Sequence, residues 1–311
     1  MNEFPLKRND AIEGPKLYQE INNIFTTMSK SHRTSFTPHN ITNKELKHFS
    51  GLIIVENKTI KRLGQISDYF QEQHRIIAKR YDEEKSPLQY WQDNSELSRN
   101  EVSKNVKECT NFCGTIICVF IKMYKSKRIL DFSSGWGDRL FGVMTYDDKI
   151  KYYCGIDPNK SLQTGYKNMI KTFIPKSSHK KYEMITACAE DTINNLNEEF
   201  DLVFTSPPYF DLEKYSNDNN QSITRYPDFE DWYKNFLLNS MIQAFDKLVD
   251  HGIMAININN TKDYNIIDKL IEDMNKLPFI KFNGIIYYGN PKIRSYIYQP
   301  VLVWEKDLSL I

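Results

Sequence analysis

The feature that most constrains the fold is an alternation of short apolar runs with longer helical patterns, which begins near residue 105. Five runs are typical of buried strands: residues 128–133, 152–157, 184–191, 200–206 and 252–260. Apolar residues recur at helical spacing over residues 110–125, 138–146, 161–173, 229–249 and 264–277. Residues 283–289 and 299–306 resemble a closing hairpin-like pair of strands. This alternation predicts an α/β fold with a parallel, doubly wound sheet.

The residues before this point follow another pattern. Residues 67–84 have helical spacing behind cap candidates Ser67 and Asp68, and Pro87 then breaks the helix. Residues 1–50 are rich in turn-forming side chains. We therefore expect a mainly helical N-terminal region, residues 1–105, followed by one α/β domain, residues 106–311.

Charge and cysteine content narrow the class of protein. The 311 residues carry 41 basic and 40 acidic side chains, so net charge by itself indicates no polyanionic partner. The start of the chain is charged and has no signal-peptide pattern, and the longest apolar run, from Gly114, is too short to span a bilayer. Five cysteines without a CxxC pair favour a reducing compartment over disulfides or a zinc site. We expect a cytoplasmic, non-secreted protein that does not bind a membrane.

Polar and glycine residues follow the ends of the first three predicted strands. Asp131 ends the first strand, and Gly135 and Gly137 lie in the turn after it. Asp157 ends the second predicted strand, and Glu190 and Asp191 end the third. Ligands of parallel sheets bind beyond these strand ends, where glycines let the backbone approach and a carboxylate accepts hydrogen bonds from ribose hydroxyls. The three ends together indicate a ligand that contains adenosine.

The glycine turn differs from that of dinucleotide-binding proteins. Their fingerprint G-x-G-x-x-G requires a third glycine, and this chain has Leu140 at that position. NAD and FAD are therefore disfavoured as ligands.

The fourth strand runs into the sequence TSPPY, residues 205–209. An exocyclic amino group on a base or amide is a poor nucleophile because its lone pair is delocalised. A site that methylates it must accept its hydrogens, which the hydroxyl of Ser206 and a backbone carbonyl can do. Pro207 and Pro208 make the turn rigid, and the ring of Tyr209 can stack on a planar substrate.

TSPPY resembles the catalytic motif of S-adenosylmethionine-dependent DNA amino-methyltransferases, which act on the exocyclic nitrogen of cytosine or adenine. The resemblance covers residues 105–305 and implies a Rossmann-like methyltransferase fold: a mostly parallel seven-stranded sheet with a terminal antiparallel strand. The serine is most similar to the cytosine-N4 enzymes, and adenine N6 is the second choice. No metal is expected, because the methyl donor is already activated.

The resemblance also implies roles for individual residues. The catalytic set is Ser206, Pro207, Pro208 and Tyr209. The set that contacts S-adenosylmethionine is Asp131, Ser133, Gly135, Gly137, Asp157, Glu190 or Asp191, and Thr110 with Asn111. The turn SSGWG departs from the commoner form of this family because Trp136 is bulky.

DNA is the expected partner, which would place the protein wherever the host DNA resides, and a cognate restriction nuclease is a further candidate partner. In the loop of residues 210–227, Phe210, Arg225 and Tyr226 are the candidate contacts to nucleic acid. We expect this loop to be mobile in the free protein and to close over a flipped nucleotide. Sequence recognition would fall to residues 1–105, to this loop or to another chain.

Other activities remain open from the sequence. Methylation of guanine N2 in RNA, methylation of a protein amide, and a catalytically silent nucleic-acid-binding role are the alternatives. Amide methyltransferases resemble N-P-P-Y, so Ser206 disfavours that reading. Pro-Cys is absent, so methylation at cytosine C5 lacks its nucleophile. Trp232, Tyr233 and Phe236 have helical spacing and are expected in the core.

Overall fold

The computed structural model describes residues 112, 114–145, 150–174, 177–212, 215, 218–289 and 298–310. The predicted helical region of residues 1–105 lies outside the described residues, and so do Thr110 and Asn111.

The described chain is built on a seven-stranded sheet with the order β3-β2-β1-β4-β5-β7-β6. Its strands are β1 (Arg128–Asp131), β2 (Tyr152–Ile156), β3 (Lys181–Ile185), β4 (Phe200–Thr205), β5 (Leu248–Asn257), β6 (Ile280–Gly289) and β7 (Tyr298–Lys306). The pairs from β3 to β5 are parallel, and β7 runs antiparallel to both β5 and β6. The prediction of a mostly parallel seven-stranded sheet with one antiparallel strand is confirmed.

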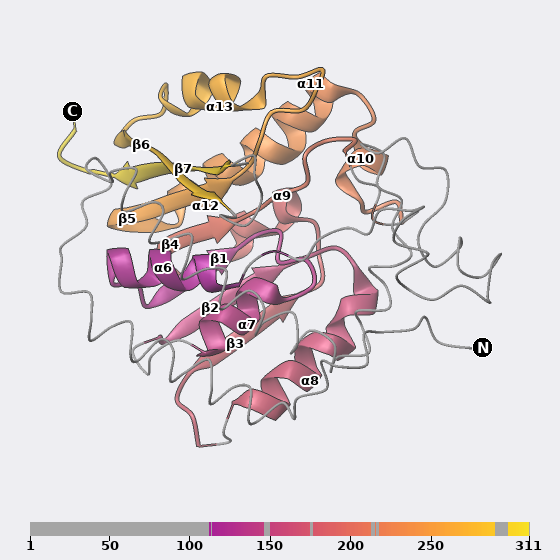
Figure 1. Ribbon diagram of the computed structural model, residues 1–311, viewed down its shortest axis with the longest axis vertical. Helices are drawn as coiled ribbons and strands as arrows, with labels where there is room; N and C mark the ends of the chain where they lie inside the picture. The colour runs from indigo at the N-terminus through magenta and orange to yellow at the C-terminus, as the bar shows by residue number, and fades with distance from the viewer. Residues whose placement is uncertain are drawn as a thin grey trace.

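Helices cover both faces of the sheet, with α8 and α13 at opposite ends of it (Figure 1). One face packs against α6 (Thr115–Tyr124), α7 (Asp138–Thr145) and α8 (Gln163–Phe173). The other packs against α9 (Ala189–Thr192), α11 (Phe229–Asp231), the π-helical segment η6 (Trp232–Leu238), α12 (Asn239–Asp246) and α13 (Ile266–Met274). Short helices η4 (Lys160–Leu162), η5 (Ile193–Asn195) and α10 (Ser222–Arg225) complete the described elements. None of these helices combines the length and apolar character needed to cross a membrane.

The core follows from the alternation of side chains along buried strands. In β4, Leu202 and Phe204 pack on the α6–α8 face, and Val203 packs on the opposite face. In β7, Val303 packs on the α6–α8 face and Trp304 packs on the opposite face. Both faces are therefore apolar, as expected of a sheet between two helical layers.

Several sequence predictions of element boundaries were wrong, and three of them matter most for the site. The helix predicted over residues 110–125 begins at Thr115 and has Gly114 at its N-cap, so neither Thr110 nor Asn111 caps it. The strand predicted over residues 184–191 ends at Ile185. The single helix predicted over residues 229–249 is divided by η6 and ends at Asp246.

The division of the long helix has a packing reason. A π-helical turn is wider than an α-helical one, and such turns are found mostly as local insertions in α-helices. Here it brings Trp232, Tyr233, Phe236 and Leu237 together into the core, where all four are buried. The expectation that the first three of these are core residues is confirmed.

Candidate active site

The turn between β1 and α7 has two glycines with left-handed backbone. Gly135 has φ 55° and Gly137 has φ 88°, which other residues rarely adopt. A Cβ on Gly137 would lie 3.2 Å from Met169 Sδ. A Cβ on Gly135 would meet, among the described residues, no atom nearer than Ser133 O at 3.9 Å. Position 137 therefore requires glycine, and the space beside Gly135 is open to a ligand.

Asp131 supports this turn from behind. Its fully buried carboxylate accepts hydrogen bonds from Thr205 Oγ1 at 2.8 Å, Arg139 Nε at 2.7 Å and Tyr153 Oη at 2.8 Å. Arg139 also donates to the carbonyl of Ser133 in the turn. The prediction of Asp131 as a direct cofactor contact is corrected: its carboxylate is enclosed by protein donors and joins β1, β2, β4 and α7.

Asp157 follows β2 and lies against the glycine turn. Its Oδ2 accepts from Gly135 N at 2.9 Å and its Oδ1 accepts from Asn159 N at 2.9 Å. Burial raises the pKa of Asp157 to about 6, although these two N–H groups act in the opposite direction. The group is thus mainly ionised at neutral pH. A carboxylate has about four acceptor positions, so acceptor capacity remains for ligand hydroxyls.

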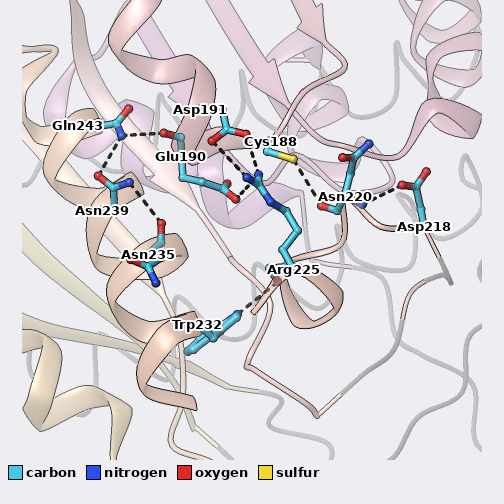
Figure 2. A network of polar contacts seen from close by, with 11 residues as sticks. Cys188, Glu190, Asp191, Asp218, Asn220, Arg225, Trp232, Asn235, Asn239 and Gln243 are labelled. Atoms are coloured by element: carbon cyan, nitrogen blue, oxygen red, sulfur yellow. Dashed lines mark hydrogen bonds and ion pairs between the residues drawn. The ribbon is translucent and has the colours of Figure 1, made fainter. Parts of the chain in front are cut away.

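Glu190 and Asp191 lie in the short helix α9 instead of at a strand end. Both pair with one guanidinium: Arg225 Nη1 is 2.7 Å from Glu190 Oε1 and 2.7 Å from Asp191 Oδ2 (Figure 2). The Glu190 side chain is only 3% exposed, whereas that of Asp191 is 58% exposed. Burial raises the pKa of Glu190, and Arg225 opposes this shift. Asp191 is therefore the more accessible acceptor for a ligand.

A predicted cofactor contact and a predicted nucleic-acid contact thus belong to one ion-pair cluster. Arg225 ends α10, and its guanidinium lies 5.3 Å from the centre of the Tyr226 ring. Cys188 Sγ lies near Glu190 and Asp191 at a spacing that would suit a metal ion. Because Arg225 already supplies the positive charge there, we assign no metal to this cluster.

The segment of residues 218–226 is attached to the rest of the domain at several points (Figure 2). Cys188 Sγ donates to the carbonyl of Asn220 at 3.6 Å, and Trp232 Nε1 donates to Ser222 Oγ at 3.3 Å. Together with Arg225, these contacts hold α10 against α9 and η6. The expected mobility of the loop over residues 210–227 stays a prediction.

The turn of residues 206–209 leaves the sheet at the end of β4. Ser206 Oγ donates to Asn257 Oδ1 at 3.2 Å, and Tyr209 Oη lies 3.4 Å from this oxygen and 3.4 Å from the backbone carbonyl oxygen of Asn257. Asn257 is the last residue of β5, which pairs with β4 through Thr205 and Ile256. The sequence analysis missed Asn257. The rule that ligand-binding residues follow parallel strands could have identified it, because a polar residue interrupts the apolar run of residues 252–260 at this position.

Phe210 does not have the role predicted for it. Its ring is buried, and the ring centres of Phe229, Trp232 and Tyr264 lie 5.4, 5.5 and 5.5 Å away. Its backbone is left-handed, with φ 56°, which is unfavourable for a bulky residue. Phe210 therefore anchors the turn of residues 206–209 in the core and is not a contact to nucleic acid in this structure.

Phe112, shortly before α6, contacts a residue of the Asp131 cluster. The guanidinium of Arg139 stands 4.8 Å from the centre of the Phe112 ring, and that ring meets Phe204 edge-on at 6.0 Å. This places residue 112 beside the β1 and β4 strand ends. A cofactor role for Thr110 and Asn111 stays a prediction, since both lie outside the described residues.

Comparisons with known proteins found similarity to solved structures alone. No protein-family model and no curated protein matches the chain. TrmN from Thermus thermophilus aligns at 13% identity with a TM-score of 0.43, over 62% of this chain and 48% of TrmN, about half its length. A methyltransferase from Pyrococcus furiosus aligns at 13% identity with a TM-score of 0.42, over 63% of this chain and 84% of that protein. An rRNA methylase from Streptococcus thermophilus aligns at 14% identity with a TM-score of 0.37, over 58% of this chain and 87% of that protein. Such values assign this chain neither a substrate nor a reaction.

Proposed function

We propose that this chain binds S-adenosylmethionine and transfers its methyl group to the exocyclic amino group of a DNA base, with cytosine N4 preferred. The observation that carries the proposal is the position of Ser206: its hydroxyl lies at the end of β4, held by Asn257, next to the β1 strand end with its glycine turn. Hydrogen-bond acceptors for an amino group thus adjoin a candidate nucleoside site.

The residues on the nucleoside side suit the cofactor. Open space beside Gly135 admits a ligand near the backbone, and Asp157 retains acceptor capacity for two ribose hydroxyls. Asp191, whose side chain is mostly exposed in α9, can accept from the adenine amino group. The bound cofactor would supply a methyl group on a sulfonium, which needs no further activation.

The turn of residues 206–209 would bind the target base. Ser206 Oγ and the carbonyl of Pro207 accept hydrogen bonds from the amino group, which favours rehybridisation of its nitrogen towards sp³. In the transfer, this nitrogen would form a bond to the methyl carbon as the bond between that carbon and sulfur breaks, and its surplus proton would pass to water. Tyr209 stacks on an extruded base. In this proposal, residues 1–105 are candidates for sequence recognition.

The first experiment offers DNA, RNA and protein side by side with radiolabelled S-adenosylmethionine. We expect label in DNA, and mass spectrometry of the digested DNA should identify N4-methylcytosine. N6-methyladenine would retain the mechanism and change the base. Label only in RNA or protein, or methylation at carbon, would refute the proposal.

A matched pair of variants tests the role of Ser206. Ser206→Ala should lower kcat by about 100-fold, the order expected when one polar partner of a transition state is lost, while S-adenosylmethionine binding by calorimetry persists. Ser240→Ala removes a buried serine hydroxyl from α12 and should leave kcat unchanged. Full activity of Ser206→Ala would contradict the mechanism.

A further inference from the structure

Asn257 has a fixed orientation because its two amide ends face different partners. Its Nδ2 lies 2.7 Å from the carbonyl oxygen of Pro300 on β7, and only an N–H group can make that contact. Its Oδ1 therefore points to the turn of residues 206–209, where Ser206 Oγ is 3.2 Å away and Tyr209 Oη is 3.4 Å away. The side chain is buried, and its strand pairs with β7 through Asn257 and Val301.

This orientation determines how Ser206 is used. A serine hydroxyl has one hydrogen to donate and two lone pairs to accept with. A carbonyl-type oxygen such as Asn257 Oδ1 can only accept, so the Ser206 hydrogen points to it. Ser206 therefore presents only its lone pairs to a ligand. An amino group donates its hydrogens, so it binds to such lone pairs.

We propose that Asn257 is a positioning residue that makes Ser206 a hydrogen-bond acceptor for the target amino group, by engaging the serine hydrogen from a side chain locked to Pro300. The inference rests on the proposed function and extends it to specificity: the site is set to accept from an exocyclic amino group and disfavours a carbonyl group at the same position of a base. Because an amide does not titrate, the direction of the Ser206 hydrogen is independent of pH.

The Asn257→Asp variant gives a readout that a merely structural role would not. When protonated, the introduced carboxyl copies the amide: its carbonyl oxygen accepts from Ser206 and its O–H donates to Pro300. When ionised, it places a charged oxygen against the Pro300 carbonyl and loses this orientation. Burial raises the pKa of such a carboxyl. The kcat of the variant, relative to wild type, should therefore fall at least about 3-fold as pH rises through that pKa. A ratio that is constant or rises with pH would overturn the proposal.

A double-mutant cycle tests whether Asn257 acts through Ser206. Asn257→Ala should lower kcat about 10-fold in the wild-type background, with little change in KM for S-adenosylmethionine, and less than about 2-fold in the Ser206→Ala background. In the Tyr209→Phe background the 10-fold loss should remain. Equal losses in all three backgrounds would refute action through Ser206. Asn283→Ala, which removes a buried asparagine bonded to Glu305, is the control for general destabilisation.

Neutron diffraction from crystals of the full chain exchanged into D₂O separates this inference from the proposed function, because it needs no activity. We expect deuterium on Ser206 Oγ directed at Asn257 Oδ1, and deuterium on Asn257 Nδ2 directed at Pro300. An amide turned the other way, or a serine deuterium directed away from Asn257, would overturn the inference even in an active enzyme. Absence of methyl transfer with the expected deuterium positions would refute the proposed function alone.

Discussion

Replacing Arg225 by methionine isolates the electrostatic role of the cluster in Figure 2. The change keeps an apolar stem and removes the cation that lies 2.7 Å from both Glu190 Oε1 and Asp191 Oδ2. Asp191 can be solvated by water instead. Glu190 cannot, because its side chain is 3% exposed. The variant therefore leaves one buried carboxylate without its counter-ion.

The expected loss of stability follows from these two exposures. A hydrogen bond between charged, buried partners contributes ~1.5–3 kcal/mol, and an exposed ion pair contributes ~0–1 kcal/mol. Since Arg225 itself is partly exposed, we expect a loss near the lower end, about 2 kcal/mol at neutral pH. For a domain of this size, that corresponds to a decrease in Tm of roughly 4–8 °C.

The loss should depend on pH. Burial already raises the pKa of Glu190, and removing Arg225 raises it further. The folded variant then holds the Glu190 proton more tightly than the unfolded chain does, so its free energy of unfolding falls as pH rises through the folded pKa. The difference from wild type should be largest at about pH 8 and smaller at about pH 5.

Urea unfolding followed by circular dichroism at the two pH values measures this difference. Lys269→Met is the control, because it breaks an ion pair of the same 2.7 Å length with Glu230, whose side chain is 51% exposed. The control should lose less than about 1 kcal/mol, which includes the contact of Lys269 Nζ with the Tyr233 ring, whose centre is 4.6 Å away. A loss for Arg225→Met that is equal at both pH values, or no larger than that of the control, would refute the reasoning.

Three further predictions concern the turns of the site. Gly137→Ala should lower the free energy of unfolding by about 1–3 kcal/mol, because φ is 88° and the added Cβ would lie 3.2 Å from Met169 Sδ; an unchanged thermal transition would contradict this. The affinity for S-adenosylmethionine, measured by calorimetry, should fall as pH is lowered through about 6, where Asp157 becomes protonated, and the Asp157→Ala variant should lose this dependence; identical pH profiles would remove Asp157 from the binding site. Phe210→Ala should cost about 3 kcal/mol in chemical unfolding because the ring fills an aromatic cluster, and a cost below about 1 kcal/mol would show that the ring does not anchor the turn.

The sheet could be predicted because its strands are buried on both faces. Such strands are nearly continuous apolar runs, and the polar residues that end them, such as Asp157 and Ser206, are evident in the sequence. The boundary near Ile185 was missed because residues 186–189 are small or apolar and extend the run without belonging to the strand.

Roles that depend on long-range contacts could not be predicted. The sequence predicts Asp131 as a ligand contact because it does not reveal the protein groups that donate to its carboxylate. Two of these donors, Tyr153 and Thr205, come from other strands, 22 and 74 residues away. The sequence predicts Arg225 as a contact to nucleic acid and gives no sign of its ion pair, because Glu190 lies 35 residues earlier in the chain. Phe210 directly follows the TSPPY motif in the sequence, so only the structure could show that its ring is buried in the core.

The position of β7 has a consequence for biosynthesis. This strand comes after the other six along the chain, yet it lies between β5 and β6. While the ribosome is still making it, β5 has an open edge, and open strand edges are prone to pair with other chains. The Pro300 carbonyl that fixes Asn257 also belongs to β7. A nascent chain can therefore form the parallel part of the sheet, β1 to β5, before the contact between Asn257 and Pro300 exists, and the proposed orientation of Ser206 would be reached only when β7 inserts.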